Sequence, residues 1–246
     1  MDWTDLAAFM AAREPEYHRA VRGVAPADIA ACEEGCSIAL PRVYVGFLGA
    51  MGADCGELRP FGPTQDCDFY ELVEDLPARY YPGDRYFKVS REVDTSRITR
   101  LDTFLDLAGS DGDDAPMVQF EDGGEFVPEA VTAFRFTLGE QLARNLFRSF
   151  ELDRRAHRIV VRSATGSPER AGRHVQEVLE LMAKMGFEPV LPVLPRVVCL
   201  GRAGASALVE VHAASGAVGI HMGAEDVRAL GAAGEQVLAR FPGARR

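Results

Sequence analysis

This chain of 246 residues contains no long hydrophobic run. None of its apolar segments approaches the roughly 18 residues expected of a membrane-spanning helix. Its first residues also lack a basic segment followed by an apolar one, which is the pattern of a secretory signal peptide. The sequence therefore predicts a cytoplasmic protein with no membrane partner.

Cysteine is scarce, with five residues in the whole chain, and an odd count in a chain of this length does not indicate a disulfide framework. Cys32 and Cys36 would place two thiols on one helical face, with Cys55 and Cys67 as third and fourth ligands of a zinc site. We favour the alternative that Cys32 and Cys36 are small hydrophobic core residues, because the spacing of the other two matches no standard zinc knuckle. We expect no metal and no cofactor.

Recognisable signatures of catalysis are also missing. The sequence has no Gly-x-Ser-x-Gly elbow for a serine nucleophile. The segment Thr165-Gly166-Ser167 would present amides to a phosphate at a helix start, but it lacks the lysine and the glycine spacing of a P-loop. The glycine-rich segment 109–114 lacks the EF-hand spacing and its final glutamate, which argues against calcium. We therefore expect no catalytic residues.

One cluster keeps an enzyme among the alternatives. If Ser215-Gly216 is the centre of a hairpin turn, Glu210 lies opposite His221 and beside His212 on the polar face of two strands. Such a cluster would bind a metal or exchange protons. The alternation of apolar and polar residues along an exposed strand explains the same positions equally well.

The net charge of −10 is distributed unevenly. Residues 1–150 contain 27 acidic and 14 basic residues, a net charge of −13, whereas residues 151–246 contain 10 and 13, a net charge of +3. An acidic surface repels nucleic acid and attracts basic proteins, although solvated loops explain the same composition. The carboxylates that we select as a candidate partner-binding patch are Asp111, Asp113, Asp114, Glu121 and Asp122.

Short strands are expected in the first 150 residues at 86–89, 117–120 and 131–136, where aromatic and β-branched residues stand between turn residues. Thr137 and Glu140 have the form of a capping box, so a helix is expected to begin there and to run to Phe150. These elements predict an α/β (α+β) domain over residues 1–152.

Two short helices joined by a tight apolar turn are expected within residues 23–52. Pro26 fits the first position of a helix, and Ile29, Cys32 and Cys36 recur at the helical period. A second helix is expected after Leu40-Pro41, with Gly52 as its left-handed cap. The side chains expected to form its buried face are Tyr44, Phe47, Leu48 and Met51.

The last ninety residues predict a smaller domain, 156–246, with the element order β-α-β-β-β-α. A helix is expected to start at Ser167-Pro168 and to end at Gly186. A period of two places one apolar face on the strands that follow. The strands are expected at 159–161, 197–200, 207–212 and 217–222, the last helix at 224–241, and the apolar face at Val209, Val211, Val218, Ile220 and Met222.

The helix pair at 23–52 resembles the opening of the SUKH superfamily, whose members commonly begin with a Gly-apolar-x-Pro helix, a Leu-Pro, then Tyr-x-x-Phe-Leu and a final Gly. A weaker similarity lies near residue 137, where a strand passes into an apolar helix. The resemblance implies a SUKH-like mixed sheet flanked by helices over residues 1–152. The matching residues are Pro26, Ile29, Glu33, Ile38, Leu40, Pro41, Tyr44, Phe47, Leu48 and Gly52.

The resemblance also implies a function. SUKH members are best represented among bacterial immunity proteins, which bind and neutralise a cognate toxin domain, and fungal relatives resemble regulators of cell-wall synthesis. Many toxin nucleases are basic, so we expect a toxin domain with a basic surface to dock on the acidic patch. The alternatives are a scaffold or regulatory module of a larger assembly, and a metal-dependent enzyme that uses Glu210, His212 and His221.

Overall fold

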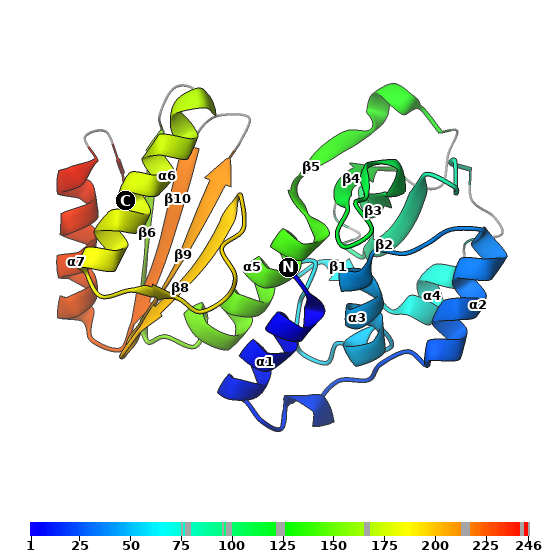
Figure 1. Cartoon of the computed structure of the whole chain (residues 1–246), viewed down its shortest axis with the longest axis horizontal. Coiled ribbons are helices and arrows are strands. Elements are labelled where there is room, and N and C mark those ends of the chain that lie inside the picture. Colours follow the sequence, from blue (N-terminus) through cyan, green and yellow to red (C-terminus); the bar gives the residue numbers. More distant parts are fainter. Residues whose placement is uncertain are drawn as a thin grey trace. The chain divides into compact units, whose positions relative to one another are not determined.

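The structure is a computed structural model that describes residues 1–74, 76, 80–94, 96, 100–121, 126–164, 168–212, 217–241 and 244–245. The chain divides into two compact units, residues 1–145 and 146–246 (Figure 1). Each contains helices and a sheet, so the predicted α+β class is confirmed, and every strand pair in the described ranges is antiparallel rather than mixed in direction. No helix in these ranges is long and apolar enough to cross a membrane.

The first unit contains a five-stranded sheet of order β1-β2-β3-β4-β5. Sequence reasoning missed β3, because its polar residues Asp102, Thr103 and Asp106 obscure the alternation typical of a strand, although Asp102 and Thr103 are buried. It also missed the first helix, α1. The elements are α1 (Trp3–Arg13), α2 (Pro26–Cys36), α3 (Arg42–Met51), β1 (Gln65–Asp66), α4 (Phe69–Glu74), β2 (Tyr86–Glu92), β3 (Asp102–Asp106), β4 (Pro116–Phe120), β5 (Thr132–Thr137) and α5 (Leu138–Phe147).

The predicted helix pair is present as α2 and α3. Pro26 is the first residue of α2, as expected, and the Glu33 carboxylate accepts a hydrogen bond from the backbone N–H of Leu40 at 2.7 Å, which closes the turn between the helices. The left-handed cap lies at Ser37 (φ 55°), at the end of α2. The prediction of such a cap at Gly52 is wrong, since its φ is −70°. Glycine fits there because a Cβ would lie 2.6 Å from the Leu48 side chain.

The buried face predicted for the second helix is confirmed, because Tyr44, Phe47, Leu48 and Met51 are all fully buried. The Phe47 ring has its centroid 5.9 Å from that of Trp3 in α1 and 5.7 Å from that of Phe61. The stripe on α2 is less enclosed than predicted: Ile29 is buried, but Cys32 and Cys36 are only half-buried. Aromatic packing around α3 therefore provides much of the core of this unit.

The other face of β2–β4 has a small aromatic cluster and a buried ion pair. The rings of Phe104 and Phe120 stack with their centroids 3.8 Å apart. Beside them on the same strands, Lys88 Nζ lies 3.2 Å from Asp102 Oδ2, and both side chains are less than a tenth exposed. The other oxygen of Asp102 accepts a hydrogen bond from the Glu92 backbone N–H at 2.9 Å. The ion pair thus links two neighbouring strands inside the unit.

The capping box at the start of α5 is confirmed. The Thr137 backbone N–H donates to the Glu140 carboxylate at 3.1 Å, and the Glu140 N–H donates to the Thr137 hydroxyl at 3.4 Å. The α-helix ends at Phe147, and a π-helical turn at Arg148–Leu152 follows it. The boundary between the units falls within α5, after Asn145, whereas the sequence predicted domains 1–152 and 156–246 with the boundary at residues 153–155.

The second unit follows the predicted element order, with one short extra strand, β7. Its sheet has the order β6-β10-β9-β8-β7, and α6 and α7 lie on one face of it. Gly186, the glycine expected to end the helix that became α6, has a left-handed φ of 81°, and Gly204, between β8 and β9, has a φ of 71°. The elements are β6 (His157–Ala164), α6 (Pro168–Lys184), β7 (Glu188–Pro189), β8 (Val197–Arg202), β9 (Ala205–His212), β10 (Ala217–Ala224) and α7 (Val227–Arg240).

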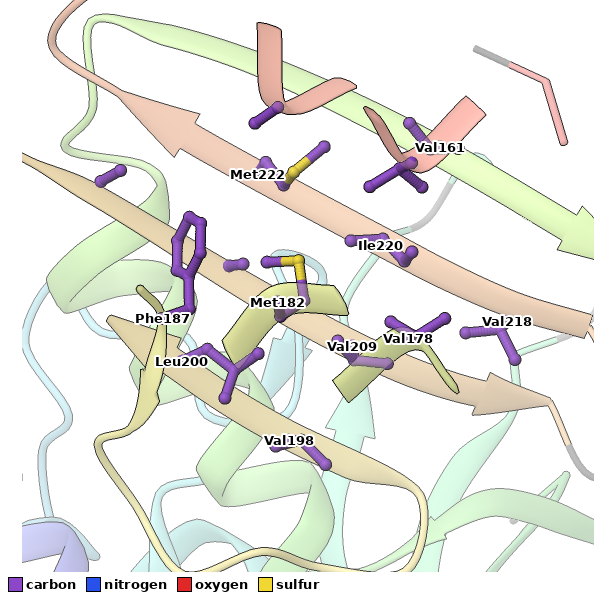
Figure 2. Packing of buried hydrophobic residues seen from close by; sticks show 14 of the residues in the cluster. Val161, Val178, Met182, Phe187, Val198, Leu200, Val209, Val218, Ile220 and Met222 are labelled. Atoms are coloured by element: carbon purple, nitrogen blue, oxygen red, sulfur yellow. The ribbon is translucent and has the colours of Figure 1, made fainter. Parts of the chain in front are cut away.

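Figure 2 shows the core between this sheet and its helices. Val178 and Met182 of α6 are fully buried against the strand residues. The apolar face predicted by the period of two is confirmed in full, because all of its members belong to this cluster: Val209, Val211, Val218, Ile220 and Met222.

The turn after α3 depends on Gly56, which has a left-handed φ of 56° and no room for a side chain, because a Cβ would lie 2.3 Å from the Ala20 carbonyl oxygen. We expect Gly56→Ala to lower the free energy of unfolding by about 1–3 kcal/mol. Denaturant unfolding followed by the fluorescence of Trp3, the single tryptophan of the chain, would measure this change. The matched control is Gly35→Ala on the exposed side of α2, where a Cβ meets nothing within 4 Å, and this change should stabilise the unit by about 0.5–1 kcal/mol. Equal effects at the two positions would contradict the structural assignment.

Candidate partner-binding surface

The segment Ser110–Asp114, which we call the acidic loop, is internally ordered. The Asp111 carboxylate accepts hydrogen bonds from the backbone N–H groups of Asp113 (2.9 Å) and Asp114 (2.8 Å). The Ser110 hydroxyl donates to the Asp114 carbonyl oxygen at 2.9 Å. Hydrogen bonds from the backbone N–H groups of Asp114 and Asp113, in that order, lower the pKa of the exposed Asp111 carboxyl.

The acidic loop is also attached to the start of α3. The backbone N–H groups of Arg42 and Val43 donate to the carbonyl oxygens of Gly112 and Asp113, each at 3.0 Å. The first N–H groups of a helix have no partner within the helix, so the loop satisfies two of them. The Arg42 guanidinium forms an ion pair with the Asp113 carboxylate, and the two side chains are 79% and 52% exposed. The loop is therefore held in place by the first turn of α3.

Asp114 has a structural role. Its carboxylate accepts hydrogen bonds from the Thr137 hydroxyl at 2.7 Å and from the Gly139 backbone N–H at 2.9 Å. It thus joins the acidic loop to the first turn of α5, where a negative charge is favourable. Among the predicted binding residues of this loop, Asp111 and Asp113 are the exposed ones.

The structure does not gather the predicted patch into one cluster. Glu121 is exposed, but it follows the last residue of β4, whereas the acidic loop precedes the first residue. A five-residue strand with a rise of about 3.3 Å per residue separates the two by about 17 Å. Asp122 lies outside the described residues. The candidate surface is accordingly reduced to the acidic loop with Arg42, a residue that sequence reasoning missed because it stands some seventy positions from its partner.

A second group of carboxylates in the first unit, Asp66, Asp68 and Glu71, is engaged within the unit. Asp66 and Glu71 both form ion pairs with Arg91, and the Asp68 carboxylate accepts a hydrogen bond from the Tyr70 N–H at 2.9 Å, at the start of α4. The Tyr70 hydroxyl donates to the Asp28 carboxylate at 2.7 Å. These carboxylates hold α2, α4 and β2 together.

The predicted register of the Glu210 cluster is wrong. His212 pairs with Ala217, so four residues stand between the strands, Gly219 lies opposite Glu210, and His221 lies opposite Leu208. The observed pairing is therefore shifted by two residues from the predicted one, and Ser215-Gly216 lies outside the described residues. A shift of one residue in the turn centre moves the pairing by two residues, which keeps these side chains on the same face.

Glu210 and His221 still approach each other, diagonally, with His221 Nε2 3.7 Å from Glu210 Oε2. Gly219 leaves the space between the histidines open, because a Cβ there would lie 3.6 Å from His221 Nε2 and 3.9 Å from His212 Nε2. Glu210 is buried. The burial of the Cys199 thiol on the neighbouring strand, followed by the charge of Glu210, raises the pKa of Cys199. Glu210, His212 and His221 alternate along their strands with the residues that pack against α6 and α7, so these three side chains lie on the opposite face of the sheet.

The geometry for a metal is missing in the part of the chain that the structure describes, where no three or more His, Cys, Asp or Glu side chains are grouped as an ion requires. Neither the Glu210 cluster nor the four cysteines of the zinc alternative form such a group among the described residues. Cys55 and Cys67 do lie together, with their sulfurs 3.2 Å apart. The same finding covers the calcium alternative, and in the acidic loop the Asp111 carboxylate binds backbone N–H groups while the Asp113 carboxylate pairs with Arg42. The phosphate candidate, Thr165-Gly166-Ser167, lies outside the described residues.

Arg155 is the centre of a polar network that sequence reasoning did not identify. Its guanidinium donates to the Glu151 carboxylate at 2.7 Å and to the Ser206 hydroxyl at 2.9 Å, and that hydroxyl donates to the same carboxylate at 2.7 Å. The Arg155 side chain packs directly over Gly223, where any larger residue would clash, because a Cβ at position 223 would lie 2.8 Å from Arg155 Cγ. The network holds the π-helical turn against β9 and β10.

Comparisons with protein-family models, with curated proteins and with solved structures gave no match to this chain.

Proposed function

We propose that this chain is a non-catalytic binding protein of the immunity type, which neutralises a basic toxin domain by docking it on the acidic loop. Two features support the proposal. Residues 23–52 resemble the opening of the SUKH superfamily, and the second helix of that segment, α3, holds the acidic loop through two backbone hydrogen bonds.

The ordered state of the acidic loop is the observation that carries the proposal. Hydrogen bonds to Asp111, to the start of α3 and to the start of α5 hold the loop before any partner arrives. A preorganised surface loses less conformational entropy on binding, and its charges attract an oppositely charged partner during diffusion. The exposed Asp111 and Asp113 carboxylates would meet lysine or arginine side chains of the toxin.

The partner can be found by co-purification with the full chain, followed by a toxicity rescue assay with the identified protein. The proposal expects a basic toxin domain and restored growth when both proteins are produced. A partner with an acidic surface, or a toxin whose effect persists in the presence of this chain, would refute the corresponding part of the proposal.

Charge reversal tests the surface itself. We expect Asp113→Lys to slow association with the toxin about three- to tenfold and to reduce its dependence on salt, because the steering charge changes sign. Stopped-flow or surface-based kinetics at several salt concentrations would measure both effects. Folding should be little changed, since the Arg42–Asp113 pair is exposed.

The matched control is Glu188→Lys on β7 of the second unit, which changes the net charge of the chain equally at another exposed position. Association should be affected less by this change. Equal effects of the two variants would show that net charge matters and that the acidic loop is not the docking surface.

A further inference from the structure

Two cysteines that are twelve positions apart in the sequence lie in direct contact in the first unit. The sulfur of Cys55 is 3.2 Å from the sulfur of Cys67. Cys55 is half-buried, whereas Cys67 is buried. Both are free thiols in this structure. A disulfide bond has a sulfur–sulfur distance of about 2.05 Å, so the pair needs to close by only about 1 Å.

The backbone holds this pair together. The Phe69 N–H donates to the Gly52 carbonyl oxygen at 2.8 Å, which joins the end of α3 to the start of α4. Cys55 follows Gly52 by three residues, and Cys67 precedes Phe69 by two. The Cys55 thiol is further oriented by its contact with the Met51 carbonyl oxygen at 3.3 Å. The approach of the two sulfurs is thus a consequence of the fold.

The two thiols have different environments. The hydrogen bond with Cys55 and burial raise the pKa of Cys67, so Cys67 keeps its proton. Cys55 is the more accessible sulfur of the two and is the one that an oxidant reaches first. The Tyr44 hydroxyl lies close to these thiols. Its pKa is raised by burial first and then by the nearby thiols of Cys67, Cys32 and Cys55. Cys32 is therefore the competing partner that an experiment must distinguish.

We propose that Cys55 and Cys67 are an oxidation site, which forms a reversible disulfide in the presence of a hydroperoxide. The proposal goes beyond the binding function and does not depend on it. The disulfide would connect the end of α3 covalently to the start of α4 and close residues 56–66 into a loop.

The reaction balances in two steps. The Cys55 thiol loses its proton to water, its sulfur attacks one oxygen of hydrogen peroxide, the O–O bond breaks, and the leaving hydroxide takes up a proton as water. Cys55 is then a sulfenic acid. The Cys67 sulfur attacks the Cys55 sulfur, the S–O bond breaks, and the hydroxide that leaves takes the Cys67 proton as a second water. Two thiols lose two electrons and two protons, and the peroxide is reduced to two waters.

The test uses the full, reduced chain, treated with hydrogen peroxide and then denatured for thiol counting. We expect the five free thiols to fall to three, with a mass lower by two hydrogen atoms and a peptide link between Cys55 and Cys67. Dithiothreitol should restore all five. The matched control Cys36→Ser, at a half-buried position on α2, should still lose two thiols, whereas Cys55→Ser should lose none.

Three results would overturn the proposal: an unchanged thiol count, addition of oxygen without a disulfide, or a link that involves Cys32. The peptide map of the unaltered chain distinguishes these outcomes without any substitution. It therefore decides the question even if Cys55→Ser does not fold, which Trp3 fluorescence would reveal.

Discussion

Replacing Phe47 with alanine should lower the free energy of unfolding of the first unit by about 3–5 kcal/mol. The Phe47 side chain is fully buried, and its ring packs against Trp3 of α1, Tyr44 of α3 and Phe61, with centroid distances of 5.9, 5.8 and 5.7 Å. Removing the ring loses the transfer free energy of a large apolar group and leaves a cavity that three aromatic neighbours fill only in part.

Guanidinium unfolding followed by circular dichroism and by Trp3 fluorescence would measure the loss, and circular dichroism is needed because Phe47 itself contacts Trp3. The matched control is Tyr80→Ala, whose aromatic side chain is 67% exposed and should cost less than about 0.5 kcal/mol. If both substitutions cost the same, Phe47 does not lie at the centre of this core.

Asp102→Ala should also cost about 3–5 kcal/mol, for an electrostatic reason. The substitution removes the carboxylate that lies 3.2 Å from the buried Lys88 ammonium, and it also removes the acceptor of the Glu92 N–H. A buried charge that loses its ion-pair partner is far less stable than the same charge in water. Denaturant unfolding of the full chain, again followed by Trp3 fluorescence, would measure this loss.

The double variant Lys88→Met with Asp102→Leu separates this electrostatic cost from the cost of lost packing. It should recover most of the stability, because an apolar pair of similar volume carries no desolvation penalty. The matched control is Asp66→Ala, which removes a partly exposed partner of Arg91 and should cost at most about 1 kcal/mol. A double variant as unstable as Asp102→Ala would contradict the electrostatic explanation.

Local patterns in the sequence were sufficient to predict the helix pair and much of the second unit. Pro26 and the Thr137–Glu140 capping box act through neighbours within one turn of helix, and the apolar face from Val209 to Met222 follows from the alternation of side chains along a strand. β3 was missed because the polar residues of this strand, Asp102 among them, are buried by contacts with other strands, which no local pattern reveals.

The candidate site was predicted less well. The sequence identified the acidic residues, but it did not show that Asp114 binds the start of α5, that Arg42 pairs with Asp113, or that the length of β4 separates Glu121 from them. These relations join residues far apart in the chain, so they depend on how the elements pack. The predicted pairing of β9 with β10 was wrong for a related reason, since the composition of a turn does not specify which of its residues is the centre.

The sequence by itself determined where most helices and strands form and which of their faces are apolar, because these properties depend on residues within a few positions of one another. It also determined the excess of negative charge in the first part of the chain. Only the tertiary structure decided which charges are exposed on the acidic loop, which are buried as in the Lys88–Asp102 pair, and that Cys55 meets Cys67. The physical reason is that burial and contact over long sequence separations arise from packing, which depends on the whole unit.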